Sequence, residues 1–354
     1  MNEDKTKTLS GEEQAAEPAS RDRQVKIIAA FLQARAGRRG GGLHAILDAA
    51  ASPEVLSGVF RFGRRDNSLF RGLPEEPLAD AAPYLMDFSA AEEGLNWFID
   101  QGSGKAWGVF LVSKSSPDEI IDHFGRFISV RDENDAEMYF RFYDPRVLRV
   151  FLPTLTKSEA RAFFGPVAAF MIETPDSGVI EYCLGEQGLE AARLSPDQGF
   201  SEPVSIPFSS CPGEDRPPQP GAWVIRDDQI TAFSERLRRD FEDRLAALLG
   251  VAHPDKAGGL SREESSGFAA RAVAQAAKYG ITEEREAAMF AEFVLELGED
   301  FNKNKKNDWI EELLKDPDLD GRAKVQLIRK GLAERDAQPP ETSFALARAA
   351  AGRY

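Results

Sequence analysis

Several short patterns in the chain come close to sites of known chemistry. Residues 102–105 read Gly-Ser-Gly-Lys, as at the end of a phosphate-binding loop. That motif also needs a glycine at position 99 and a hydroxyl group at 106, where Ile99 and Ala106 stand. A phosphate loop runs from strand to helix, whereas the hydrophobic pattern predicts helix to strand here. We therefore predict an ordinary turn.

Residues 316–321, Asp-Pro-Asp-Leu-Asp-Gly, copy the first half of a calcium-binding loop. In such a loop a glutamate at the twelfth position binds the ion through both oxygens. The twelfth position here is Leu327. The segment is better interpreted as a joint between two helices, with aspartates capping them.

The histidines and cysteines do not form a recognisable site. They are His44, His123, His253, Cys183 and Cys211, far apart and outside any C-x-x-C pair. A structural zinc site and a disulfide framework are therefore not expected, and reduced thiols fit a cytosolic protein. We predict no metal, no cofactor and no enzymatic activity. The one catalytic alternative is a hydrolase using Asp144 with His123, which requires the two side chains to meet in a pocket.

The most distinctive segment is the aromatic run at residues 139–154. Period-two alternation predicts a strand over 137–143 that buries Phe140 and Phe142. Asp144 then fits as the N-cap of a helix with Pro145 in its first position. On the opposite side of the strand Tyr and Arg, which are typical interface anchors, predict a partner-binding edge. Its residues are Tyr139, Arg141, Tyr143, Arg146 and Arg149.

The elements around this segment alternate between strands and helices. Strands are predicted at 43–47, 84–88, 106–112, 127–131, 137–143, 167–173, 179–184 and 222–226. Helix starts are indicated by capping patterns at Ser52, Ser89, Ser116 and Thr156. This layout predicts a mixed α/β sheet domain of the α+β class.

After residue 228 the apolar residues recur every three or four positions, which predicts helices only. Ser261 begins a capping box, and Thr282 is the predicted cap of a later helix. We expect a helical bundle. The predicted organisation is a disordered tail, short helix and glycine-rich linker at 1–42, the sheet domain at 43–226, the helical lobe at 227–336, and a tail at 337–354.

Composition narrows the function classes. The 354 residues carry a net charge of −15, which argues against a nucleic-acid binder. The acidic N-terminus lacks the apolar core of a signal peptide, and no run approaches the length of a membrane span. We therefore expect a soluble, cytoplasmic protein that binds neither nucleic acid nor membrane.

Several blocks of the sequence resemble the type VI secretion effector adaptor family, also called effector chaperones. The clearest is residues 140–148, Phe-Arg-Phe-Tyr-Asp-Pro-Arg-Val-Leu, continuing to Pro153. Residues 45–50, 69–85, 107–113 and 163–167 are similar to further blocks of the family, in the same order. The motif residues are Trp107, Phe140, Phe142, Asp144, Pro145, Phe164, Gly165 and Pro166. The resemblance covers roughly residues 43–185, and His44 departs from the aromatic residue expected there.

The resemblance implies a non-catalytic role. Such adaptors bind a cognate toxic effector in the bacterial cytoplasm and deliver it to the trimeric spike protein (VgrG). We expect the effector to bind in a cleft between the two lobes, with the corner at residues 139–149 contributing. The alternative from another class is a regulatory or immunity protein that binds the toxin to silence it.

Overall fold

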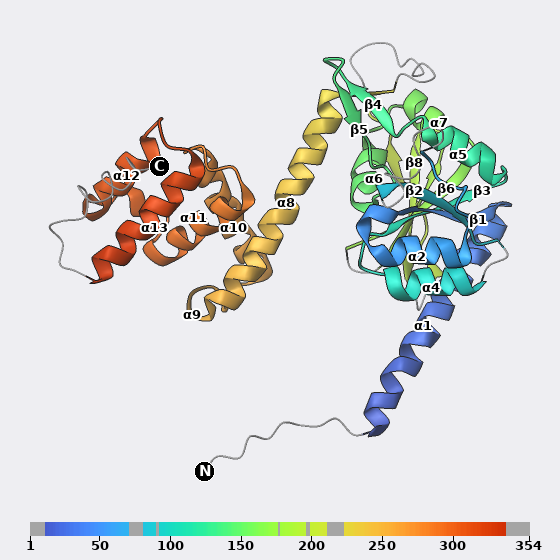
Figure 1. The fold of residues 1–354 in the computed structure, drawn as a ribbon, viewed down its shortest axis with the longest axis horizontal. Coiled ribbons are helices and arrows are strands. Elements are labelled where there is room, and N and C mark those ends of the chain that lie inside the picture. Colours follow the sequence, from blue (N-terminus) through green and yellow to red (C-terminus); the bar gives the residue numbers. More distant parts are fainter. Residues whose placement is uncertain are drawn as a thin grey trace. The chain divides into compact units, whose positions relative to one another are not determined.

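The computed structural model describes residues 11–70, 81–89, 92–175, 178–195, 199–210 and 223–337. The chain divides into two units, residues 1–233 and 234–354, and each has its own hydrophobic core (Figure 1). The proline-rich stretch at 211–220 and the predicted tail beyond residue 337 lie outside the described residues. Together the units form an α+β fold with a helical C-terminal region, which confirms the predicted fold class.

Unit 1 is built on one large antiparallel sheet. Its strands are β1 (Gly42–Asp48), β2 (Pro83–Asp87), β3 (Gly108–Ser113), β6 (Val167–Glu173), β7 (Val179–Leu184), β8 (Gly188–Ser195), β9 (Gly199–Phe200) and β10 (Val204–Pro207). Their order is β10-β8-β7-β6-β3-β1-β2, with β9 paired to β8. We did not predict β8, β9 and β10. The β8 sequence, Gly-Leu-Glu-Ala-Ala-Arg-Leu-Ser, is poor in β-branched and aromatic residues, so its pairing with β7 decides its conformation.

Helices cover both faces of this sheet (Figure 1). They are α1 (Gly11–Arg38), α2 (Pro53–Phe62) and α4 (Glu92–Gly102) on one face, and α5 (Pro117–Gly125), α6 (Pro145–Phe151) and α7 (Lys157–Phe164) on the other. Successive side chains of a strand point to opposite faces of the sheet, so neighbouring residues contact different helix layers. Phe110 contacts Phe98 of α4 with ring centroids 4.9 Å apart. Phe170, paired with the next residue of β3, contacts rings of α5 and α7 instead.

The segment before residue 43 differs from the prediction of a tail, short helix and linker. Helix α1 begins at Gly11 and ends at Arg38, and its buried residues span a little over three turns. Its buried residues are Val25, Ala29, Leu32 and Ala36. Arg35 also reaches Glu181 of β7 from this helix. The spacing of apolar residues at 25–36 indicates this helix. The glycine run at 40–42 suggested a longer linker, but only three residues separate the end of α1 from the start of β1.

A smaller sheet connects the aromatic segment to the second unit. It contains β4 (Ser129–Asp132), β5 (Glu137–Tyr139) and β11 (Val224–Ile225), in the order β11-β4-β5. Strands β4 and β5 form the predicted hairpin, whose turn is closed by Asp132 accepting hydrogen bonds from the backbone of Asn134 and Ala136. Strand β11 pairs in parallel with β4, and α8 (Asp227–Ala252) follows two residues later.

The division between the units falls inside α8, between Phe233 and Ser234, rather than at its start, where we predicted it. Ile230 and Phe233 pack against the core of unit 1, which explains this position. Unit 2 contains the rest of α8 with α9 (Pro254–Ala257), α10 (Arg262–Ala277), α11 (Glu284–Leu297), α12 (Asp308–Lys315) and α13 (Gly321–Ala337). Glu283, not Thr282, is the N-cap residue of α11. None of the described helices is both long and apolar enough to cross a bilayer.

Candidate interaction surface

The aromatic segment contains a capped helix, as predicted. The Asp144 carboxylate accepts a hydrogen bond from the Arg146 backbone N–H at 2.8 Å, and Pro145 occupies the first helical position. Phe140 and Phe142 are buried, with Phe142 fully enclosed. Residues 140–151 therefore form a rigid part of the unit 1 core, onto which the side chains around β5 are fixed.

The strand that precedes this helix is shorter than predicted. Strand β5 ends at Tyr139, and a turn follows in which the Asp144 N–H donates to the Arg141 carbonyl at 3.0 Å. The period-two pattern is lost at this turn, so Tyr143 points inward and is only 1% exposed. Our prediction that Tyr143 lies on an exposed edge is wrong. Tyr139 is 51% exposed, in agreement with the prediction.

Three of the predicted residues, Tyr139, Arg141 and Tyr143, meet at one place. Together with Asp48 and Phe70, which they contact, they form what we call the Tyr139 corner. The Tyr143 hydroxyl lies 3.1 Å from that of Tyr139. The Arg141 guanidinium donates to Asp48, a buried carboxylate at the end of β1. The Tyr139 ring meets Phe70 edge to face, with centroids 5.9 Å apart. A tyrosine face and part of a guanidinium are thus presented to solvent from a fixed base.

Burial and mutual contacts set the ionisation states of the side chains at the corner. Burial raises the pKa of Tyr143 far above its ordinary value, so this hydroxyl stays protonated. Burial also raises the pKa of Tyr139, although the bond from Tyr143 opposes it. Burial lowers the pKa of Arg141, but the bond to Asp48 and the neighbouring negative charges together raise it above its ordinary value, so the guanidinium stays charged. Neither tyrosine can serve as a base near neutral pH.

The other two predicted arginines have separate partners. Arg146 folds back onto its own cap, with Nη2 2.6 Å from an Asp144 oxygen, and is largely exposed. Arg149 donates to the backbone carbonyl of Glu173, at the end of β6. The structure therefore does not bring Arg149 into the Tyr139 corner.

The remaining motif residues have structural positions. Trp107 is buried, and its carbonyl accepts from the Asp48 N–H at 2.8 Å, which ties the start of β3 to the corner. Phe164 is buried against Phe170, and Gly165 ends α7 with φ +47°. The Pro166 carbonyl accepts a bond from the Ser113 hydroxyl at 2.7 Å.

The two residues of the hydrolase alternative have different partners. Asp144 is bonded to the backbone and guanidinium of Arg146. His123 donates from Nε2 to the Phe163 carbonyl at 2.9 Å, and burial lowers its pKa. Each side chain thus has a role in local structure, and among the described residues no hydrogen bond joins Asp144 to His123.

The near-motifs also have structural roles. Residues 102–105 form the turn between α4 and β3, in which the Gly104 N–H donates to the Glu173 carboxylate. Asp316 and Asp320 cap the joint between α12 and α13, accepting from the backbone of Asp318 and Ala323 at 2.9 and 2.7 Å. In the part of the chain that the structure describes, no three His, Cys, Asp or Glu side chains gather as metal ligands would.

We did not predict two polar clusters of unit 1, because the charged residues that form them are far apart in the sequence. Glu181, 1% exposed in β7, accepts two hydrogen bonds from Arg35 Nε at 2.9 and 3.0 Å. Arg39 donates to the same carboxylate. The sequence signal that could have indicated this cluster is Glu181 itself, a single charged residue within the apolar strand β7.

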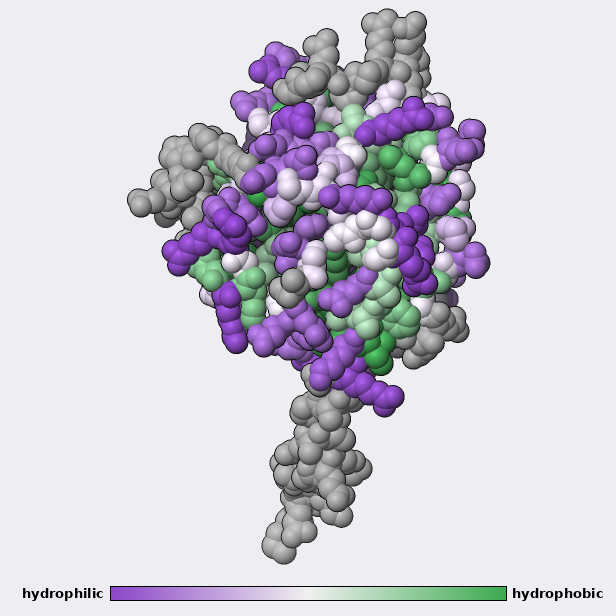
Figure 2. All heavy atoms as spheres, turned by 90° about the vertical axis from the view of Figure 1, so that its right-hand side faces the viewer, coloured by the Kyte–Doolittle hydropathy of each residue, from purple (hydrophilic) through white to green (hydrophobic). Residues whose placement is uncertain are grey.

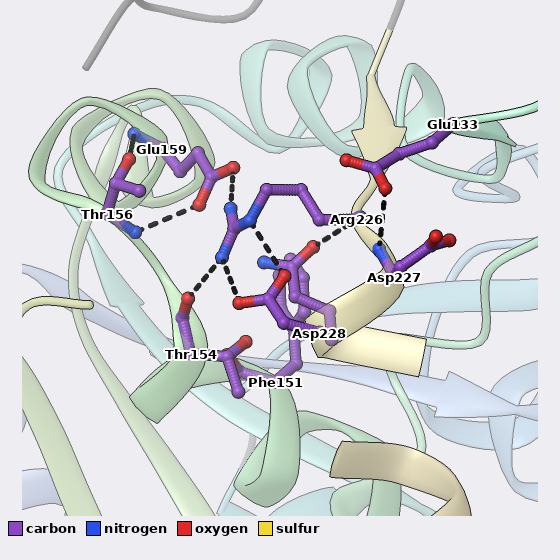
Figure 3. Close-up of polar contacts among 9 residues, drawn as sticks. Glu133, Phe151, Thr154, Thr156, Glu159, Arg226, Asp227 and Asp228 are labelled. Atoms are coloured by element: carbon purple, nitrogen blue, oxygen red, sulfur yellow. Dashed lines mark hydrogen bonds and ion pairs between the residues drawn. The ribbon is translucent and has the colours of Figure 1, made fainter. Parts of the chain in front are cut away.

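The second cluster surrounds Arg226, directly before α8 (Figure 3). Its guanidinium bonds Glu159, which also accepts from the Thr156 N–H in the α7 capping box. The Arg226 guanidinium also donates to the Thr154 carbonyl at 2.7 Å and to Asp228 at 3.0 Å. One arginine thereby joins the start of α7, the turn that follows α6 and the start of α8.

Figure 2 shows one face of unit 1, where hydrophobic groups appear between hydrophilic ones rather than merging into one broad patch. On this face, apolar side chains are thus exposed in small groups. At the edge strand β5, Met138 is 37% exposed beside the half-exposed Tyr139.

Residues 43–162 match the family model described as a domain of unknown function (DUF4123). The match begins at β1, includes the Tyr139 corner and ends within α7. No curated protein and no solved structure matches the chain. The matched residues contain β1, β2 and β3 of the large sheet and the β4–β5 hairpin, whereas β6 to β10 lie outside the match.

Proposed function

We propose that the protein is an effector adaptor of type VI secretion. It binds a cognate toxic effector in the bacterial cytoplasm and delivers it to the trimeric spike protein, without catalysing a reaction. The observation that carries this proposal is the family match over residues 43–162, which covers most of the blocks that resemble the adaptor family.

The Tyr139 corner supports a binding role. Tyrosine and arginine contribute large contact area and directional hydrogen bonds, and they dominate the energy of many interfaces. Here the base of the corner is held by the bond from Arg141 to the buried Asp48 carboxylate and by the Tyr143 hydroxyl. A partner would meet a preorganised surface, which lowers the entropy cost of association. We propose Met138, Tyr139 and Arg141 as the effector-facing residues.

The experiment is affinity purification of the tagged full-length protein from its native cells, with mass spectrometry of bound proteins. Recovery of both a spike protein and a toxin-like protein supports the adaptor function. Recovery of the toxin without the spike favours the immunity alternative. A monodisperse protein that brings down neither contradicts the proposal.

A further inference from the structure

A groove on unit 2 gathers positive charge in a chain whose net charge is −15. It lies between α11 and α13 and has a volume of about 320 Å³. Its charged lining residues are Arg285, Glu286, Arg322, Arg329 and Lys330, four cations with one acid. Its other lining residues are Met289, Val325, Gln326 and Ala333. We call it the basic groove.

The helix geometry explains why these side chains gather. On α13 the lining residues recur at three- and four-residue intervals from Arg322 to Ala333, so they form one stripe along three turns. On α11, Arg285 and Met289 are one turn apart and face the same groove. The opposite sides of both helices are buried in the core of unit 2, with Phe290 and Ile328 fully enclosed.

The three arginines of the groove have no hydrogen bond or ion pair to any residue within the described parts of the chain. Arg285, Arg322 and Arg329 are all exposed. Lys330 is 3.9 Å from Glu334, a weak contact. By contrast, arginines elsewhere on this unit, such as Arg244 and Arg271, are paired with glutamates. The groove therefore holds guanidinium groups whose hydrogen-bonding capacity is directed to solvent.

We infer that the basic groove binds an acidic amphipathic helix of a partner protein. Guanidinium groups pair with carboxylates through two parallel hydrogen bonds, which favours glutamate and aspartate side chains. Arg322 and Arg329 are seven residues apart, about 10 Å along the helix, so they match carboxylates two turns apart on a docked helix. Met289 and Ala333 supply an apolar floor above the buried Val325, and methionine adapts readily to different apolar side chains.

A nucleic acid fits the groove less well. The chain's net charge repels phosphate, and the lining includes no aromatic side chain on which a base would stack. The inference goes beyond the proposed function, because it concerns unit 2 and would hold for any activity of unit 1.

The test uses the full-length protein and a fluorescein-labelled 18-residue helical peptide. The peptide carries glutamates seven residues apart beside a leucine stripe, and a matched peptide has lysine at those glutamate positions. Fluorescence anisotropy at low and high salt measures binding. We expect saturable binding of the acidic peptide that weakens with salt, and no binding of the lysine peptide.

Two charge-reversed variants distinguish the groove from general electrostatics. Arg322→Glu with Arg329→Glu should weaken binding of the acidic peptide at least tenfold. Lys256→Glu with Arg262→Glu makes the same charge change at exposed positions of unit 2 outside the groove, and should leave affinity within twofold. Circular dichroism of each variant establishes that the helices are intact. Met289→Ala, which keeps every charge, should weaken binding severalfold.

The inference is overturned by equal loss of binding in both charge variants, or by no saturable binding of the acidic peptide. It is also overturned if a single-stranded oligonucleotide binds the groove and the peptide does not. Analytical ultracentrifugation of the protein alone tests whether it self-associates. Self-association that Arg322→Glu with Arg329→Glu abolishes would assign the groove to a second copy of this chain instead.

Discussion

At the scale of single residues, the buried carboxylate of Glu181 is the most consequential polar group of the large sheet. Burial raises its pKa, but the hydrogen bonds from Arg35 and Arg39 outweigh burial, so the net shift is downward. A carboxylate with a lowered pKa in the folded state stabilises the protein at pH values where it is also ionised in the unfolded chain. Its contribution is therefore complete above its ordinary pKa of 4.5 and is lost as the pH falls through the lower, folded value.

Glu181→Gln should lower the free energy of unfolding by about 2–3 kcal/mol at pH 7. This is less than the roughly 3–5 kcal/mol of a fully buried pair, because Arg35 and Arg39 remain partly exposed. Chemical denaturation at several pH values measures the difference, which should shrink below pH 4.5. Glu202→Gln, at an exposed position after β9, is the matched control and should change stability by less than about 0.5 kcal/mol. A loss that does not depend on pH would contradict this account.

Asp144 provides a second test at this scale, because its carboxylate caps α6 and is almost fully buried. Asp144→Ala should cost about 1–2 kcal/mol in thermal or chemical denaturation, since the first turn loses its acceptor. Asp144→Asn retains an acceptor oxygen and should recover most of that loss. An equal cost for both variants would mean that the charge toward Arg146, rather than the cap, is what matters.

At the scale of elements, the end of α7 depends on Gly165. Its φ is +47°, and a Cβ at this position would overlap the buried His123 ring. Gly165→Ala should therefore cost about 3 kcal/mol or more, combining backbone strain with a displaced core side chain. Gly104 has φ +78° with open space around it, so Gly104→Ala should cost only about 1 kcal/mol. Similar losses for the two variants in denaturation curves would show that the His123 contact is unimportant.

Arg226 should control the first turns of α8 (Figure 3). Arg226→Met removes bonds to Glu159, Thr154 and Asp228 and leaves a largely buried carboxylate without its cation, at a cost of about 2–3 kcal/mol. Hydrogen exchange of residues 227–233 should accelerate. Arg239→Met, further along the same helix, breaks only an exposed pair with Glu235 and should leave those amides unchanged. Unchanged exchange in Arg226→Met would contradict the assigned role.

Local signals in the sequence were sufficient to predict most helices and strands, but not which side chains meet at the surface. Capping boxes at Ser116, Thr156 and Ser261 are all present, because they depend on residues three positions apart. Strand β8 was missed because its pairing partner, not its composition, makes it a strand. Tyr143 was misplaced because a turn at 141–144 interrupts the alternation, and nothing in the aromatic pattern marks it. Contacts such as Asp48–Arg141 join residues 93 positions apart and depend on the assembled sheet.

At the scale of the whole molecule, the two units have cores that share no residue among those described. Phe290 is fully buried in unit 2, and Phe170 is fully buried in unit 1. Phe290→Ala should destabilise unit 2 by about 3–5 kcal/mol and leave hydrogen exchange of β3 and β6 unchanged. Phe170→Ala should do the converse. Equal acceleration in both units would show that they unfold as one cooperative body.

We propose that the Tyr139 corner holds the effector. Met138→Glu with Tyr139→Ala alters two exposed side chains of this edge and keeps the bond from Arg141 to Asp48. Val204→Glu introduces the same new charge at the exposed edge strand β10. The most direct measurement is quantitative capture of toxin and spike from native cells by tagged wild type and both variants. We predict that the corner variant loses at least nine-tenths of the toxin while the control captures as much as wild type. Undiminished capture of the toxin by the corner variant would contradict the account.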